Sequence, residues 1–95
     1  MKPITTINGA WSEQANAWVS ETLCLTGDCW LEVELPSKGR LVIKKSETAN
    51  GPRPKALITP WSGPKFRITV HGSTEARYIQ IHLTETPNTI QYANI

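Results

Sequence analysis

The stretch that decides the fold is residues 65–83, KFRITVHGSTEARYIQIHL. Its two ends, residues 65–71 and 76–83, alternate apolar and polar side chains, and the residues between them are small or polar. The apolar positions are Phe66, Ile68 and Val70 in the first end and Ile79, Ile81 and Leu83 in the second. Period-two alternation on both sides of a polar turn predicts an antiparallel hairpin with one buried and one solvated face.

A second pair of segments, residues 18–25 and 29–35, flanks the turn sequence Thr26-Gly27-Asp28. In the first segment, alternation predicts Val19, Leu23 and Leu25 inward and Trp18, Ser20, Thr22 and Cys24 on the other side. In the second, it predicts Leu31, Val33 and Leu35 inward and Trp30, Glu32 and Glu34 outward. We expect these segments to form a second hairpin.

Shorter segments complete the pattern. The further strands expected are residues 4–7, 40–45, 55–59 and 89–95, with the first and last as edge strands. Residues 11–18 are compatible with a short helix or with strand or irregular structure. Prolines and a glycine at 50–54 exclude regular structure there, and residues 60–64 form a rigid turn that contains Trp61.

These segments predict the fold class. The sequence contains seven or eight short strands about 8–12 residues apart, separated by Gly, Pro, Asn and Asp turns, which is typical of an all-β domain. Alternation favours antiparallel sheets with one solvated face. We therefore expect residues 1–95 to form a single small antiparallel β-sandwich of immunoglobulin-like type, with an OB-like β-barrel as the alternative.

One segment has a family likeness. Residues 76–84, ARYIQIHLT, resemble the late strands of immunoglobulin-like and BACON-type bacterial modules, a likeness that covers about twenty residues with the rest of its hairpin. The Cys and Trp spacing of true immunoglobulin domains is absent, because Cys24 and Cys29 are too close in sequence to bridge two sheets. Likeness of this kind concerns the fold and implies little about function.

The cysteine pair leaves two states open. Cys24 and Cys29 would face each other across the neck of the second hairpin, which suits a disulfide. Two buried free thiols are the alternative. A zinc site is not expected, because structural zinc takes four ligands at recognisable spacings and the only histidines, His71 and His82, lie far downstream. No cofactor is expected.

Positive charge is concentrated in residues 38–67, which hold eight Lys or Arg and one Glu, a net charge of +7, whereas the rest of the chain has −5. The candidate binding residues here are Arg40, Lys44, Arg53, Lys55, Trp61 and Arg67. Cations around an aromatic ring are typical of single-stranded nucleic-acid binding. Known nucleic-acid motifs are missing, so a nucleic acid or other polyanion is an alternative partner.

The four tryptophans offer another kind of surface. An exposed Trp30 or Trp61 would stack on a sugar ring, with Glu32, Glu34 or Gln80 as hydrogen-bonding neighbours. A carbohydrate-binding module is therefore a further alternative.

The main expectation is a non-catalytic module that binds another macromolecule or assembles with copies of itself, with a protein or a second copy of the chain as the expected partner. Edge strands and the contrast between acidic and basic regions offer contact surfaces for this. The spacing of nucleophiles, histidines and carboxylates suggests no catalytic set, so no enzyme activity is expected. No segment approaches the ~18 apolar residues of a membrane span, so no membrane partner is expected. The compartment is left open.

Overall fold

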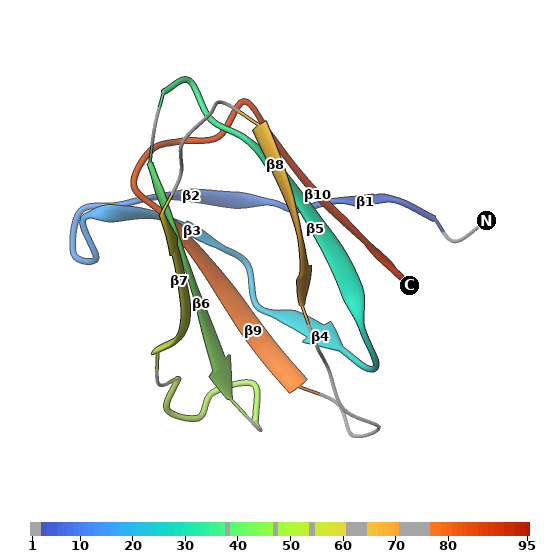
Figure 1. The fold of residues 1–95 in the computed structure, drawn as a ribbon. Coiled ribbons are helices and arrows are strands. Elements are labelled where there is room, and N and C mark those ends of the chain that lie inside the picture. The colour runs from blue at the N-terminus through green and yellow to red at the C-terminus, as the bar shows by residue number, and fades with distance from the viewer. Residues whose placement is uncertain (1–2, 38, 47, 54, 61–64, 71–76) are drawn as a thin grey trace.

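The computed structural model describes residues 3–37, 39–46, 48–53, 55–60, 65–70 and 77–95, which contain ten β-strands and no helix (Figure 1). The strands are β1 (Thr5–Thr6), β2 (Gly9–Ser12), β3 (Ala17–Ser20), β4 (Leu23–Leu25), β5 (Cys29–Glu34), β6 (Arg40–Ser46), β7 (Lys55–Pro60), β8 (Lys65–Val70), β9 (Arg77–Leu83) and β10 (Thr89–Asn94).

The strands form two sheets with antiparallel pairing throughout. Sheet A has the order β1-β10-β5-β8, and sheet B has the order β2-β3-β9-β6-β7, with β4 also paired to β9. In Figure 1, β5, β8 and β10 of sheet A lie on the right, and β3, β6 and β7 of sheet B lie on the left. The predicted all-β class with antiparallel sheets is confirmed.

Two pairs of short strands act as one strand each. β1 and β2 follow each other and pass from sheet A to sheet B, while β3 and β4 both pair with β9. Counted as eight strands, sheet A has the order 1-8-3-6 and sheet B the order 1-2-7-4-5, because the first strand belongs to both sheets. Two antiparallel sheets of this kind fit the class of small β-sandwiches and barrels, and the immunoglobulin-like type and its OB-like alternative stay predictions.

The core lies between the sheets and follows the predicted alternation. Its buried members include Leu31, Val33, Leu35, Leu41, Ile43, Val70, Ile79, Ile81 and Leu83, with Phe66 and Ile68 packed against it and half-buried. The inward faces expected for residues 29–35, 65–70 and 79–83 are therefore confirmed.

The expected hairpin over residues 65–83 is wrong. Its two halves are strands, but β8 pairs with β5 in sheet A and β9 pairs with β3, β4 and β6 in sheet B. The residues between them, 71–76, lie outside the described part of the chain. Alternation shows that each strand buries one face, and both sheets bury their inner faces in the same core. The pattern therefore fits a crossing between sheets as well as a hairpin.

The second expected hairpin is wrong for the same reason. β4 belongs to sheet B and β5 to sheet A, so residues 26–28 connect the two sheets. The predicted inward side of residues 18–20 is also wrong: Trp18 and Ser20 are buried, whereas Val19 is half-exposed. Leu23 and Leu25 are buried as predicted, because residues 21–22 interrupt the strand and change which positions point inward.

Ser20 stabilises this interruption. Its hydroxyl accepts a hydrogen bond from the backbone N–H of Ile81 on β9, 2.8 Å from the donor nitrogen, and donates one to the carbonyl of Glu21 at 2.8 Å. A side chain thus takes the place of a backbone partner where β3 ends and β4 has not yet begun. The break lets a single chain segment place Trp18 and Leu23 on the same inner face.

The remaining strand predictions are mostly confirmed. Residues 40–45 and 55–59 correspond to β6 and β7, and residues 4–7 contain the short edge strand β1. Residues 11–18 form no helix but the β2–β3 hairpin, in which Trp11 pairs with Trp18 and Asn16 has a φ of 51°. The prediction that the last strand is an edge is wrong, because β1 covers the outer side of β10.

Candidate functional site

Sheet A presents a polar outer face. The outward residues of β5 are Trp30, Glu32 and Glu34, those of β8 are Lys65, Arg67 and Thr69, and those of β10 include Thr89 and Gln91. Register aligns them in rows across the three strands. Glu32 lies between Arg67 and Gln91, and Glu34 lies between Lys65 and Thr89.

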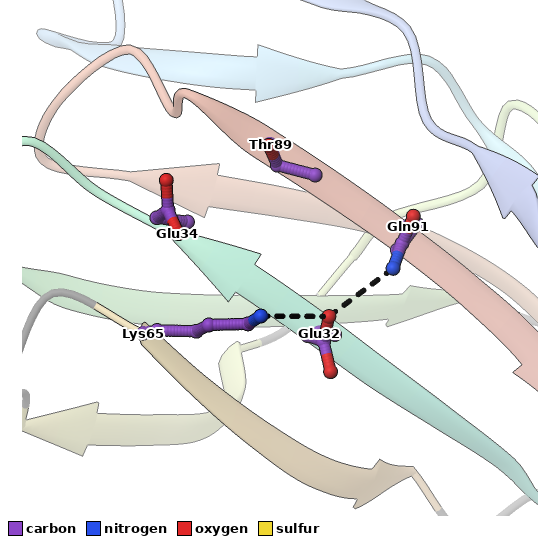
Figure 2. A pocket seen from close by; sticks show the side chains of 5 residues that line it. All are labelled: Glu32, Glu34, Lys65, Thr89 and Gln91. Atoms are coloured by element: carbon purple, nitrogen blue, oxygen red, sulfur yellow. Dashed lines mark hydrogen bonds and ion pairs between the residues drawn. The ribbon is translucent and has the colours of Figure 1, made fainter.

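Glu32 is the centre of the contacts on this face. Its Oε2 accepts hydrogen bonds from Nη2 and Nε of Arg67 at 3.0 and 3.3 Å, and its Oε1 accepts one from Nε2 of Gln91 at 3.1 Å. Nζ of Lys65 lies 3.7 Å from Oε1. Figure 2 shows Lys65 and Gln91 reaching Glu32 from opposite sides.

These contacts keep Glu32 ionised. The hydrogen bond from Arg67 is the largest cause that lowers the pKa of Glu32 below its ordinary value of 4.5, and the charges of Lys65 and Arg67 and the amide of Gln91 act in the same direction. Partial desolvation opposes them and is outweighed. Glu32 is therefore a hydrogen-bond acceptor at neutral pH.

Arg67 also contacts the predicted aromatic platform. Its guanidinium carbon lies 4.4 Å from the ring centroid of Trp30, which is cation–π distance. The guanidinium therefore covers one face of the indole. A sugar or a base that stacked on that face would first have to displace Arg67.

A shallow polar depression of about 140 Å³ lies beside this contact (Figure 2). Its lining residues are Glu32, Glu34, Lys65, Thr89 and Gln91. Two carboxylates, an ammonium group, an amide and a hydroxyl make it a hydrogen-bonding surface with little apolar area. Among the described residues, no group of three or more His, Cys, Asp or Glu could hold a metal ion.

The predicted binding residues do not form one patch. Trp30 and Arg67 meet on sheet A, as just described. The others belong to the sheet B half: Arg40 begins β6 and is exposed, Lys44 is half-buried in β6, Lys55 begins β7, and Arg53 precedes β7 and donates to Thr22 Oγ1 and to the carbonyl of Ala49. Trp61 lies outside the described residues. The basic segment is thus divided between the two sheets.

The two cysteines are free thiols. Cys24 points outward from β4 and is exposed, whereas Cys29 begins β5 and is buried. The hairpin neck that would have brought them together does not exist, since their strands belong to different sheets. Burial raises the pKa of the Cys29 thiol, and the charge of Asp28 adds to this while Lys45 opposes it.

Sequence reasoning missed Thr89 and Gln91 as site residues, and it counted Lys65 only as part of the basic segment. All three occupy outward positions of alternating strands, so their exposure was predictable. That these residues lie next to Glu32 was not predictable, because it depends on the pairing of β5 with β8 on one side and with β10 on the other.

The outer edge of β8, defined as the edge facing away from β5, is the second notable surface. Among the described strands, β8 has β5 on one side and no strand on the other. Its six residues pair with β5 without a register shift. The side chains of Lys65 and Arg67 are each 59% exposed, and Ile68 is half-buried against the core.

The other edges of the two sheets are shorter or interrupted. β1, β4 and β2 have two, three and four residues. β7 is as long as β8, but its pairing with β6 contains a register shift between Ile43 and Lys44, and it ends at Pro60. Short strands, bulges, prolines and charged side chains are the usual devices that protect a sheet edge from pairing; β8 carries the charges of Lys65 and Arg67 but has no proline and no register shift over residues 65–70.

Comparison with protein-family models, with curated proteins and with solved structures finds no match for this chain. The residues that the structure describes include no helix that is long and apolar enough to cross a membrane. Functional inference for this chain therefore rests on its own residues.

Proposed function

We propose that this domain is a non-catalytic interaction module that binds another protein chain by strand addition at the outer edge of β8. The observation that supports the proposal is the regular six-residue edge, which no described strand covers and which neither proline nor bulge interrupts. Backbone N–H and C=O groups along such an edge offer hydrogen bonds to an extended segment of another chain.

The two alternative functions have weaker support. Sugar stacking on Trp30 is opposed by Arg67, which covers one face of the ring. Polyanion binding is opposed by the division of the cations between the two sheets. Among the described residues, no surface combines an open aromatic ring with a continuous group of cations.

The carboxylates of sheet A also favour a non-catalytic role. A general acid of a glycosidase pair needs a raised pKa so that it keeps its proton at neutral pH. Arg67 acts on Glu32 in the opposite direction. His82, for its part, lies on the outer face of sheet B, away from these carboxylates.

Hydrogen exchange with extended peptides tests the proposal. The peptides alternate valine with glutamate, threonine or lysine and are mixed with the intact protein. At least one class of peptide is expected to slow the exchange of backbone amides in residues 65–70, because an added strand would form hydrogen bonds with the N–H and C=O groups on the outer edge of β8. Unchanged exchange in this segment with every class would overturn the proposal.

Proline substitutions provide a control in which strand addition at the β8 edge is blocked. Neighbouring residues of a strand direct their N–H groups to opposite edges, so only one of Ile68→Pro and Thr69→Pro removes an outward donor. That variant is recognised because it melts near the wild type, with Ile68→Ala as the reference for lost packing. It is expected to lose peptide binding, and full binding by it would contradict strand addition.

A further inference from the structure

We infer that the segment bound at the β8 edge is an acidic amphipathic strand, in which Asp or Glu alternates with apolar residues. The inference rests on the proposed function and names the chemistry of its partner. It follows from the charges, the half-buried side chains and the alternation of β8.

The outward side of β8 favours acidic neighbours. Lys65 and Arg67 lie on the edge strand itself, and both of their side chains are more than half exposed. Glu32 and Glu34 belong to β5, whose backbone lies about 4.8 Å further from the edge by ordinary strand spacing. Both cations reach Glu32, at 3.7 and 3.0 Å, and an acidic side chain on an incoming strand would meet the part of each cation that remains exposed.

The inward side of β8 favours apolar neighbours. Phe66 and Ile68 pack against the core but remain half-buried, because they lie at the margin of the sheet. An apolar residue placed opposite Ile68 would extend the core by one strand and remove further apolar surface from water.

Alternation combines the two preferences. Residues directly opposite each other in a pair of strands point to the same face. The partner positions opposite Lys65 and Arg67 would face outward beside cations, and those opposite Phe66 and Ile68 would face inward. Acidic residues two positions apart, with an apolar residue between them, therefore match this edge.

A second copy of the chain matches it less well. If the β8 strands of two copies paired edge to edge, with their apolar faces on the same side of the joined sheet, four cations, two from each strand, would lie together on the opposite face. Lysine and arginine on an edge strand disfavour such self-pairing. The same charges that exclude a copy or a basic strand are favourable for an acidic one.

The three peptide classes separate the candidates. The glutamate peptide is expected to bind most tightly and the lysine peptide least tightly, as measured by fluorescence titration of labelled peptide together with exchange of the amides of residues 65–70. Raising salt from 0.1 to 1 M shortens the Debye length from about 10 to about 3 Å and is expected to reduce the advantage of the glutamate peptide. A peptide of the same composition in which the glutamates are consecutive should bind more weakly than the peptide in which glutamate and valine alternate.

Two threonines on the same face provide matched variants. Thr69 lies on the edge strand and Thr89 on the interior strand β10, and both are exposed. Thr69→Lys should tighten binding of the glutamate peptide by about two- to fivefold, the effect expected of one cross-strand charge pair, and Thr69→Glu should weaken it similarly. Thr89→Lys and Thr89→Glu change the net charge equally and should have little effect.

The outcomes distinguish the inference from the function. If the threonine or lysine peptide binds as tightly as the glutamate peptide and protects residues 65–70, the acidic partner is wrong and strand addition stands. If the protein dimerises with concentration and protects the same amides without peptide, the occupant is a second copy and the inference is overturned. If nothing protects these amides, both proposals fail.

Discussion

Ser20 is the residue on which the break between β3 and β4 depends. It is only 3% exposed, and its hydroxyl is hydrogen-bonded on both sides, to the Ile81 N–H and the Glu21 carbonyl. Serine is small enough to be buried there and polar enough to replace a missing ladder partner. Its position on the inner side could not be predicted from alternation, because the break at residues 21–22 changes the parity.

Replacing Ser20 tests this role. Ser20→Ala leaves the Ile81 N–H buried without its acceptor, and we expect the free energy of unfolding to fall by about 1–3 kcal/mol. Urea denaturation measures the change. Ser37→Ala is the control: Ser37 is exposed and donates to Glu85, and its loss should change stability by less than about 0.5 kcal/mol. Equal effects of the two substitutions would contradict the assigned role.

His82 makes stability depend on pH. It lies on the outer face of sheet B between Val19 and Val42, and burial, followed by the charge of Lys44, lowers its pKa below the ordinary 6.5. The unfolded chain therefore binds a proton at higher pH than the folded chain does. The contribution is fully present above pH 6.5 and is lost as pH falls through the folded pKa.

Two measurements check this prediction. The His82 ring resonance should titrate below pH 6.5 in the folded protein. The urea midpoint should fall between pH 7.5 and 5.5 in the wild type and fall less in His82→Gln. A separate loss is expected below pH 4.5, where Glu32 begins to protonate in the unfolded chain, and Glu32→Gln should remove it. An unchanged pH profile in His82→Gln would show that another group is responsible.

At the scale of the elements, the passage of consecutive strands between sheets is the main feature that alternation did not predict. Both expected hairpins, over residues 18–35 and 65–83, are crossings from one sheet to the other. Strand existence and inward faces were predictable for β5, β8 and β9, because they depend on side chains within each strand. The strand that each of them pairs with was not predictable, since an amphipathic strand can join either of the two sheets around the same core.

The crossing at residues 26–28 has a chemical consequence. Cys24 faces outward from β4 and Cys29 faces the core from β5. We therefore expect iodoacetamide to label Cys24 rapidly and Cys29 only slowly in the folded protein, since Cys29 is buried and its pKa is raised. Mass spectrometry of a labelling time course distinguishes the two sites. Equal labelling rates, or an intramolecular disulfide formed in the folded protein under mild oxidant, would contradict the crossing.

At the scale of the whole molecule, the two sheets share one core. The buried cluster takes Leu31 and Val33 from sheet A and Leu41 and Ile81 from sheet B. Neither sheet can therefore bury its apolar face without the other. The connectivity strengthens this dependence, because the chain passes repeatedly between the sheets and each sheet is completed only by strands distant in sequence.

Matched core truncations test the shared core. Leu31→Ala in sheet A and Ile81→Ala in sheet B remove side chains that are 1% and 0% exposed, and each should lower stability by about 2–5 kcal/mol. Hydrogen exchange should show both sheets losing protection together in either variant. Ile4→Ala, at a position 55% exposed, should change stability by less than about 0.5 kcal/mol. Loss of protection confined to one sheet would show that the sheets unfold separately.

The amino-acid sequence by itself determined the fold class, most of the strands and the inward side of nearly all of them. Each of these follows from alternation and turn residues within a short segment. Only the tertiary structure decided which strands are neighbours, and with them the Glu32 contacts, the polar depression and the open edge of β8. The physical reason is that backbone hydrogen bonds are alike for any pair of strands, and the inner faces of both sheets carry the same apolar pattern.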